Sequence, residues 1–234
     1  MAILKIGGSA EQDTGRLILP VEGAVGIYFT NQSKLKLSNN FASGRLTNQV
    51  MGNPVPQPNF TTLSLTGGYV QTPLPETKEM TVLAIYKQPV TTSAGVMICS
   101  NYGGPNPSGF GVGLQITSTN KVTFIASHLN AATPTSGGRT VNATGWTLVA
   151  GRVKGNTNYI KNMTNGELSE ATYTSRIDGA NNALLRIGAC YAVNYNESVE
   201  VMAVVVFNRA LVDSEINSVS DVLRRYAAKH GVTV

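Results

Sequence analysis

The stretch "VMAVVVFNRALVDSEINSVSDVLRRYAAKHGV", residues 201–232, decides the fold of this chain. It begins as a valine-rich run typical of a buried strand, turns at Asn208 and Arg209, and continues with a helical pattern. The apolar stripe of this helix recurs at spacings of three and four residues, and consists of Ile216, Val219, Leu223, Tyr226 and His230. No other part of the chain shows so clear a helical pattern, which predicts a protein of strands that closes with one helix.

The ends of this helix can also be predicted. The carboxylate of Asp213 is expected to cap the first turn, and Glu215 suits the positive end of the helix dipole. Gly231 is a natural residue for the position just after the helix. Basic amphipathic helices can bind membranes, but the apolar stripe is narrow, so packing on the strands is the expected role.

Upstream, short segments rich in Val, Ile, Thr and aromatic residues alternate with Gly, Pro, Asn and Ser, as strands and turns do. The predicted strands are residues 24–29, 68–72, 79–87, 95–100, 109–117, 121–127, 145–153, 157–162, 168–173, 183–192 and 199–207. Hairpin turns are expected at Asn120 and at Asn165-Gly166. Strands at short intervals without helices between them predict an all-β, antiparallel two-sheet sandwich.

The facing of two strands follows from their alternation. Phe110, Val112, Leu114 and Ile116 share one face of their strand, and one buried face with one wetter face is the expected arrangement. Trp146 leads another strand and is predicted to point its ring into the core. Residues 130–138, "NAATPTSGG", are expected to form a flexible loop.

Length and composition favour one domain. The chain has 234 residues with 42% hydrophobic content, enough for a single sandwich that needs no disulfide or metal. Residues 1–20 are predicted to be an N-terminal arm or edge strand, and residues 21–234 one sandwich domain. Within the arm, the apolar run 2–6 precedes a Gly-containing polar connector, an arrangement suited to docking on a neighbour's sheet. Cys99 and Cys190 lie in apolar runs and are predicted to be buried free thiols.

Charge and hydropathy argue against several classes of function. Only 13% of residues are charged and the net charge is +5, but the bases are scattered and form no stripe with aromatics, so nucleic-acid binding is not expected. No apolar run reaches the roughly 20 residues of a membrane span, so no membrane insertion is expected. The start of the chain does not resemble a signal peptide, which predicts that the chain is made in the cytosol.

Several of these segments together resemble a known family. The order "GYVQTPLPETKEMTVLAIYK", "GWTLVAGRVKGNTNYIKN", "LLRIGACY" and "VMAVVVFNRALVDSEI" is similar to that of concanavalin A-like, laminin-G-like jelly rolls. The resemblance runs from about Ala24 to the C-terminus. The family often has Ser or Thr where Val212 stands, so here Asp213 is expected to cap the helix alone. The acidic clusters that bind calcium in many members have no clear counterpart, so no metal or other cofactor is expected. The resemblance implies the fold more than the function.

Titratable residues give little sign of an enzyme. His128 and His230 have no nearby partner at metal-ligand spacing. Jelly-roll glycosidases use two closely set carboxylates, but the close acidic pairs here have a spacing of three, which puts strand residues on opposite faces. These pairs are Glu76 with Glu79, Glu167 with Glu170, and Glu197 with Glu200, and all are expected to be solvated charges. The chain is therefore predicted to be non-enzymatic.

Two loops are candidates for binding a ligand or partner. Both mix Tyr with Asn and Gly, because Tyr offers a rigid amphipathic surface and the Asn amide both donates and accepts hydrogen bonds. The candidate residues are Asn101, Tyr102 and Asn106 in the first loop, and Tyr191, Asn194 and Tyr195 in the second. The alternative is that the same residues simply make turns.

These observations lead to one expectation and two alternatives. The expected function is that of a bacteriophage or prophage virion structural protein (a capsid decoration, head-fibre or tail-tip component), with recognition of a receptor or host-surface glycan. Such a protein would be located in the virion and would partner other virion proteins and copies of itself. The alternatives are a stand-alone carbohydrate-binding lectin and, with less support, a glycoside hydrolase. The sequence does not choose the host, the glycan or the oligomer number.

Overall fold

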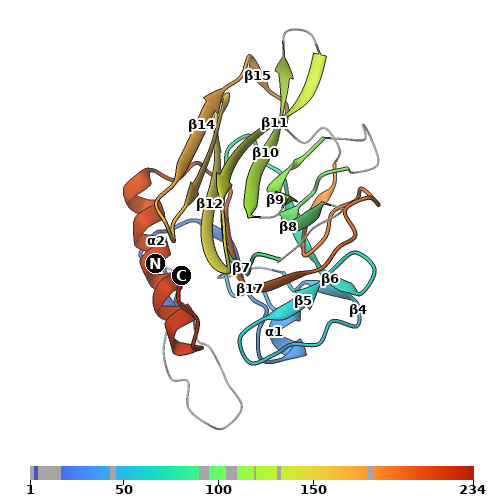
Figure 1. The fold of residues 1–234 in the computed structure, drawn as a ribbon, viewed down its shortest axis with the longest axis vertical. Coiled ribbons are helices and arrows are strands. Elements are labelled where there is room, and N and C mark those ends of the chain that lie inside the picture. Colours follow the sequence, from blue (N-terminus) through green and yellow to red (C-terminus); the bar gives the residue numbers. More distant parts are fainter. Residues whose placement is uncertain are drawn as a thin grey trace.

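The chain folds as two antiparallel sheets packed face to face, with helix α2 (Asp213–Lys229) lying along the outside of one of them (Figure 1). This computed structural model describes residues 3–4, 17–42, 46–89, 95–103, 110–118, 120–130, 133–178 and 182–234. The predicted two-sheet sandwich with a C-terminal helix is confirmed.

The first sheet has seven strands among the described residues. Six follow one another in the spatial order β14 (Leu168–Thr172), β13 (Thr157–Asn162), β12 (Trp146–Lys154), β7 (Met80–Lys87), β17 (Val199–Phe207) and β3 (Ala24–Phe29). The seventh, β5 (Thr61–Leu63), pairs with the start of β17. The closing strand β17 thus lies deep in the sheet, where its valine-rich sequence can be buried on both faces.

In the part of the chain that the structure describes, the second sheet has eight strands. Seven follow the order β11 (Thr133–Asn142), β10 (Lys121–Asn130), β9 (Val112–Ser118), β8 (Val96–Ser100), β16 (Leu184–Ile187), β6 (Gly68–Pro75) and β4 (Gln49–Gly52). The short strand β15 (Ser175–Arg176) pairs with the end of β10. Each predicted strand overlaps one of the strands in the two sheets.

Three smaller elements lie in the N-terminal part of the chain. Strands β1 (Ile3–Leu4) and β2 (Leu17–Ile18) pair antiparallel within the segment predicted as an arm. Leu19, just after β2, is buried against the helix side of the seven-stranded sheet. Helix α1 (Lys34–Ser38) is a single turn capped by Ser33, in a region expected to be turn and loop.

The main core fills the space between the two sheets. Alternate residues of β9 point into it, including Val112, Leu114 and Ile116, as their alternation predicted. They meet residues of the facing sheet such as Val149 and Val204. This continuous apolar layer accounts for stability without a disulfide, and Cys99 and Cys190 are both buried free thiols, as predicted. Burial raises the pKa of Cys99 to about 12 and that of Cys190 to about 11.

A second apolar cluster lies between the seven-stranded sheet and helix α2. Leu223 and Tyr226 of the helix are buried there against Phe29 and Phe207 of the sheet. The ring centroids of Phe29 and Tyr226 are 4.2 Å apart. The predicted helix stripe is therefore a packing surface, and the seven-stranded sheet is covered on both faces.

The helix begins differently from the prediction. Val212 occupies the N-cap position, and the carboxylate of Glu215 accepts a hydrogen bond from its backbone N–H at 2.9 Å. Asp213 is instead the first helical residue and accepts a bond from Arg152 at 2.7 Å. The expected cap by Asp213 is wrong because its side chain turns outward to a neighbouring cation. At the other end, Gly231 adopts a φ of +72° after the helix, as predicted.

Trp146 also lies elsewhere than predicted. It points to the same face as Leu148, which is the helix side of the sheet, and is only partly buried there. Its ring centroid is 6.0 Å from that of Phe60. The alternation in β12 was recognised correctly, but both faces of this sheet are covered, and Val149 and not Trp146 faces the other sheet.

The predicted loop at residues 130–138 largely belongs to strand β11. This strand pairs with β10 over ten residue positions, from Lys121 opposite Asn142 to Asn130 opposite Thr133. Its small polar residues show no apolar alternation because β11 is the last strand on its side of the sheet. Backbone pairing, which composition does not reveal, makes it a strand.

Candidate ligand-binding surface

The outer faces of the two sheets are covered in different ways. Helix α2 lies along the outer face of the seven-stranded sheet (Figure 1). On the eight-stranded sheet, Leu185 and Ile187 of β16 point into the core, so Arg186 between them points outward. Val70 of β6 is likewise buried, and Tyr69 and Gln71 lie on the outer face. This face therefore presents polar and aromatic side chains.

Arg186 is held between two tyrosine rings. Its guanidinium carbon lies 4.7 Å from the ring centroid of Tyr69 and 3.5 Å from that of Tyr191. Such stacking suits the planar, weakly hydrated guanidinium and fixes its orientation. Together with Gln71, these residues form what we call the tyrosine–arginine surface.

Hydrogen bonds fix the members of the tyrosine–arginine surface further. The Nε of Arg186 donates to Oε1 of Gln71 at 2.9 Å, and its Nη1 donates to the carbonyl of Cys190 at 2.8 Å. The hydroxyl oxygen of Tyr191 lies 3.3 Å from the same Gln71 oxygen and 3.1 Å from the carbonyl of Leu184, so its single O–H can donate to either acceptor. The side chains are thus set in place before any ligand arrives, which lowers the entropic cost of binding.

The tyrosine–arginine surface continues onto the edge of the sheet. In the pairing of β4 with β6, Met51 lies opposite Tyr69 and Gln49 opposite Gln71, so both point outward. Met51 is 39% exposed and Leu184, on β16, 37%. Exposed apolar side chains beside oriented polar groups are the usual mixture of a recognition surface.

The two predicted binding loops meet beside this surface. The backbone N–H of Tyr191 donates to the carbonyl of Tyr102 at 2.9 Å, which joins the loops directly. The rings of Tyr102 and Tyr195 are edge to face, 5.6 Å apart. Both pack on a small apolar cluster of Met97, Ile125 and Cys190 on the outer face of the sheet. This packing anchors the second loop across the sheet, with the rings partly exposed.

Of the predicted binding residues, three tyrosines lie on this face and Asn101 does not. Tyr102, Tyr191 and Tyr195 are partly exposed, and Asn194 is exposed in the second loop. Asn101 is fully buried, and its amide donates to the carbonyl of Ala183 and accepts from the N–H of Val112. Asn101 therefore needs correction from a surface residue to one that anchors the loop. Asn106 lies outside the described residues.

Sequence reasoning missed Tyr69, Gln71 and Arg186. All three lie in predicted strands, whereas the composition typical of binding residues occurs in the loops. A signal was present, because in "LLRIG" a lone Arg interrupts apolar residues, and in "GYVQT" Tyr and Gln alternate with Val. Outward-facing polar residues on a strand are common, so the pattern alone does not separate a site from a solvated face.

Glu76 is not the solvated charge that was expected. Its carboxylate is buried and forms an ion pair with Nη2 of Arg176, whose side chain is 1% exposed. The amide of Asn101 also donates to Glu76, at 3.0 Å. The sequence did not reveal this because the partner lies 100 residues away, on β15. Through Asn101, the ion pair ties the start of the first loop to β15, which is a structural role for a carboxylate.

His128 is a buried strand residue, not the start of a loop. It lies within β10, its Nε2 is 2.9 Å from Oδ1 of Asn158, and its ring stacks on Tyr173 at 4.5 Å. Burial lowers the pKa of His128, and the nearby Arg176 lowers it further. The imidazole is thus kept neutral inside the sandwich. Among the described residues, no group of three or more His, Cys, Asp or Glu side chains could hold a metal ion.

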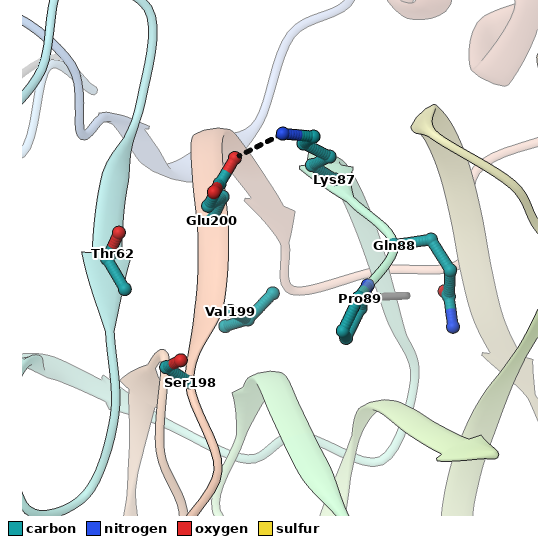
Figure 2. Close-up of a pocket in the computed structure, with 7 residues that line it drawn as sticks. All are labelled: Thr62, Lys87, Gln88, Pro89, Ser198, Val199 and Glu200. Atoms are coloured by element: carbon teal, nitrogen blue, oxygen red, sulfur yellow. Dashed lines mark ion pairs between the residues drawn. The ribbon is translucent and has the colours of Figure 1, made fainter. Parts of the chain in front are cut away.

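A small pocket lies at the end of the seven-stranded sheet, where β5, β17 and β7 lie side by side (Figure 2). Its volume is about 180 Å³. Lys87 and Glu200 face each other across its rim, with their charged atoms 3.3 Å apart, and Pro89 and Val199 line its interior. Because each charge already has a partner, this pocket offers less to a ligand than the tyrosine–arginine surface does.

A second, shallower pocket of about 470 Å³ lies beside β12, β13 and β14. Its lining includes Arg152 and Glu170, whose charged atoms are 4.0 Å apart. The carboxylate of Glu79, also in the lining, accepts from the backbone N–H of Gly155 at 3.1 Å. Arg152 and Glu170 are thus engaged with each other, and Glu79 with the backbone.

The fold and the matched sequence define the family. Residues 64–217, well over half of the 234, match the family model described as the concanavalin A-like lectin/glucanases superfamily. The chain belongs to this superfamily. None of the curated proteins compared with it matches it in sequence.

Solved structures with the same fold include enzymes and binding domains. A Trypanosoma rangeli sialidase, in complex with 2,3-difluorosialic acid, is 17% identical with a TM-score of 0.59, over 86% of this chain and 33% of the sialidase. The binding domain of botulinum neurotoxin DC, in complex with SialylT, is 14% identical with a TM-score of 0.59, over 86% of this chain and 52% of that one. The serotype D binding domain is 15% identical with a TM-score of 0.56. The chain spans between a third and about half of these proteins, so the likeness is one of fold.

Proposed function

We propose that this chain is a non-enzymatic, lectin-like recognition module that binds a carbohydrate through the tyrosine–arginine surface. The observation that carries the proposal is the stack of Arg186 between Tyr69 and Tyr191, oriented by Gln71. Aromatic rings offer apolar faces to the C–H side of a sugar, and amide and guanidinium groups hydrogen-bond its hydroxyls. The superfamily and the binding domains with this fold, one of them in complex with SialylT, support this class of ligand.

The non-enzymatic part of the proposal is supported by two buried titratable groups, because each already has a structural partner. Glu76 is committed to Arg176 and Asn101, and His128 to Asn158. A glycoside hydrolase would instead need a pair of carboxylates facing the sugar. Incubating a bound oligosaccharide with the protein should release no new reducing ends, and measurable release would contradict this part.

The binding proposal is tested by a glycan array and one pair of variants. Tyr191→Ala removes one ring of the stack, and we expect it to weaken binding about tenfold or more, because truncation of an aromatic hot-spot residue has a cost of this size. The matched control is Tyr173→Ala. This tyrosine contacts Arg139 and lies outside the tyrosine–arginine surface. Equal binding by wild type and Tyr191→Ala would contradict the proposal.

We further propose that this module works in a tailed-bacteriophage or prophage particle, made in the host cytoplasm and assembled with other virion proteins. The low charge content of 13% and the apolar run at residues 2–6 before a Gly-containing connector support it. Deleting residues 1–15 spares Leu19, which packs with the helix, and should leave a folded sandwich that no longer assembles or docks. Sedimentation of the truncated protein checks this, and an unchanged assembly state would contradict it.

A further inference from the structure

We infer that the tyrosine–arginine surface selects a sugar that carries a carboxylate, with Arg186 as the residue that binds this group. This inference rests on the proposed function, since it names the class of glycan bound at the same surface. It begins from the charge of Arg186, which is presented on the outer face of the sheet and is partly exposed.

The guanidinium of Arg186 has donors to spare. An arginine has five N–H groups, and the described part of the chain supplies acceptors for two of them, Oε1 of Gln71 and the carbonyl of Cys190. Both acceptors are uncharged. Within the described residues, no Asp or Glu forms an ion pair with Arg186. The charge is oriented but not neutralised.

A comparison with Arg152 shows what a neutralised arginine looks like in this fold. Arg152 also stacks on a tyrosine, 4.2 Å from the ring centroid of Tyr159. Unlike Arg186, it pairs with Asp213 at 2.7 Å and lies 4.0 Å from Glu170. The helix side of the molecule thus supplies carboxylates to its stacked arginine. We call the outer face of the eight-stranded sheet the open face. There, the carboxylate that pairs with the stacked arginine would come from a ligand.

The chemistry of the group favours a carboxylate. The planar fork of a guanidinium matches the two oxygens of a carboxylate, and hydrogen bonds between two charged groups are about twice as strong as neutral ones. The two tyrosine rings keep the fork in one plane, so little further side-chain entropy is lost on binding. A neutral sugar could stack on the tyrosine rings but would bring no negative charge to pair with the Arg186 guanidinium.

A purely structural role for Arg186 is the competing explanation, because its bond to the carbonyl of Cys190 also holds the second loop in place. The two roles differ in a measurable way. A structural role affects the melting temperature and all ligands equally, whereas a recognition role affects the preference for charged over neutral sugars.

The test uses an array that carries uronic acid oligosaccharides beside their methyl esters, in which one added methyl group removes the charge of each carboxylate. We expect the wild type to bind an acid form about tenfold or more tightly than its ester, the size of a charged hydrogen-bonded contact. Arg186→Gln should remove this preference while still binding the ester. Arg152→Gln, the matched control, should keep it. Added salt should weaken binding of the acid and not of the ester.

Each outcome decides a different point. Equal binding of acid and ester by the wild type, or a preference retained in Arg186→Gln, would overturn the inference and leave the proposed function standing. Binding to no oligosaccharide on the array, acidic or neutral, would contradict the proposed function itself. If Arg186→Gln fails to fold, Arg186→Lys keeps a charge without the planar fork, and an undiminished preference in that variant would overturn the fork's role.

Discussion

Each outer face of this sandwich carries an arginine stacked on tyrosine, and the two arginines have different roles. On the seven-stranded sheet, Arg152 stacks on Tyr159 and is neutralised by Asp213 at the start of helix α2. On the eight-stranded sheet, Arg186 stacks on Tyr69 and Tyr191 with only uncharged acceptors among the described residues. The first arrangement fastens a helix to a sheet, and the second presents an oriented cation on a surface.

The difference shows why one face is a packing surface and the other a candidate site. The helix buries the apolar cluster that holds Leu223 and Tyr226, so changes there should reduce the free energy of unfolding. The open face buries little beyond the small cluster under Tyr102 and Tyr195, so changes there should alter binding. Substitutions on each face can test this division.

The largest expected effect is on the helix face. Leu223 is fully buried between the helix and the sheet. Leu223→Ala should lower the free energy of unfolding by about 2 to 5 kcal/mol, because it removes buried methyl groups and leaves a cavity. Chemical denaturation measures this. The matched control on the open face is Leu184→Ala, at a residue that is 37% exposed, with an expected change within about 1 kcal/mol. Equal costs would mean that the two faces are not different in kind.

A smaller effect is expected at Trp146. Its ring is partly buried beside Phe60 at the margin of the helix-side cluster. Trp146→Ala should therefore cost about 1 to 3 kcal/mol, less than the 3 to 5 kcal/mol typical of a fully buried ring. Thermal and chemical denaturation would show it. A loss above this range would return the ring to the core between the sheets.

A smaller effect still is expected at Glu215, and it depends on pH. Arg209 and the N–H of Val212 hold the pKa of this carboxyl below its ordinary value of 4.5. A lowered pKa in the folded state adds stability that is present above pH 4.5 and is lost as the pH falls through the folded-state pKa. Glu215→Gln should lower the free energy of unfolding by about 0.5 to 1 kcal/mol at pH 7. The effect is small because the ion pair with Arg209 is partly exposed to solvent.

The check on Glu215 is a pair of unfolding titrations, one at pH 7 and one in strong acid. The difference between wild type and Glu215→Gln should shrink in acid, where both side chains are uncharged. A difference that stays constant with pH would show that the helix start does not depend on this charge.

Much of the fold could be predicted from the sequence, because strands that carry apolar residues have a recognisable local pattern. The valine-rich run at 199–207 and the helix stripe around Leu223 were recognised from their spacing and are confirmed. Strand β11 was missed because its Thr, Ser and Gly residues become a strand only through pairing with β10. The face to which Trp146 points could not be chosen either, since a sheet covered on both sides has two apolar faces.

The candidate site was only partly predictable. Tyr102, Tyr191 and Tyr195 were found from loop composition, and the structure brings them to one side of the eight-stranded sheet. Arg186 was not found, because its environment comes from Tyr69, more than a hundred residues away in the chain. The same is true of Glu76, whose partner Arg176 lies on a distant strand. Contacts of this range follow from the sheet order, which local patterns do not give.

The central claim is that ligand recognition belongs to the open face and not to the helix face. The most direct test is hydrogen–deuterium exchange of the protein in solution, with and without a glycan that the array has identified as a ligand. We predict slower exchange in β6 (Gly68–Pro75) and in residues 184–195 when the glycan is present, with α2 unchanged. Protection centred on α2, or on the pocket between Lys87 and Glu200, would contradict the claim.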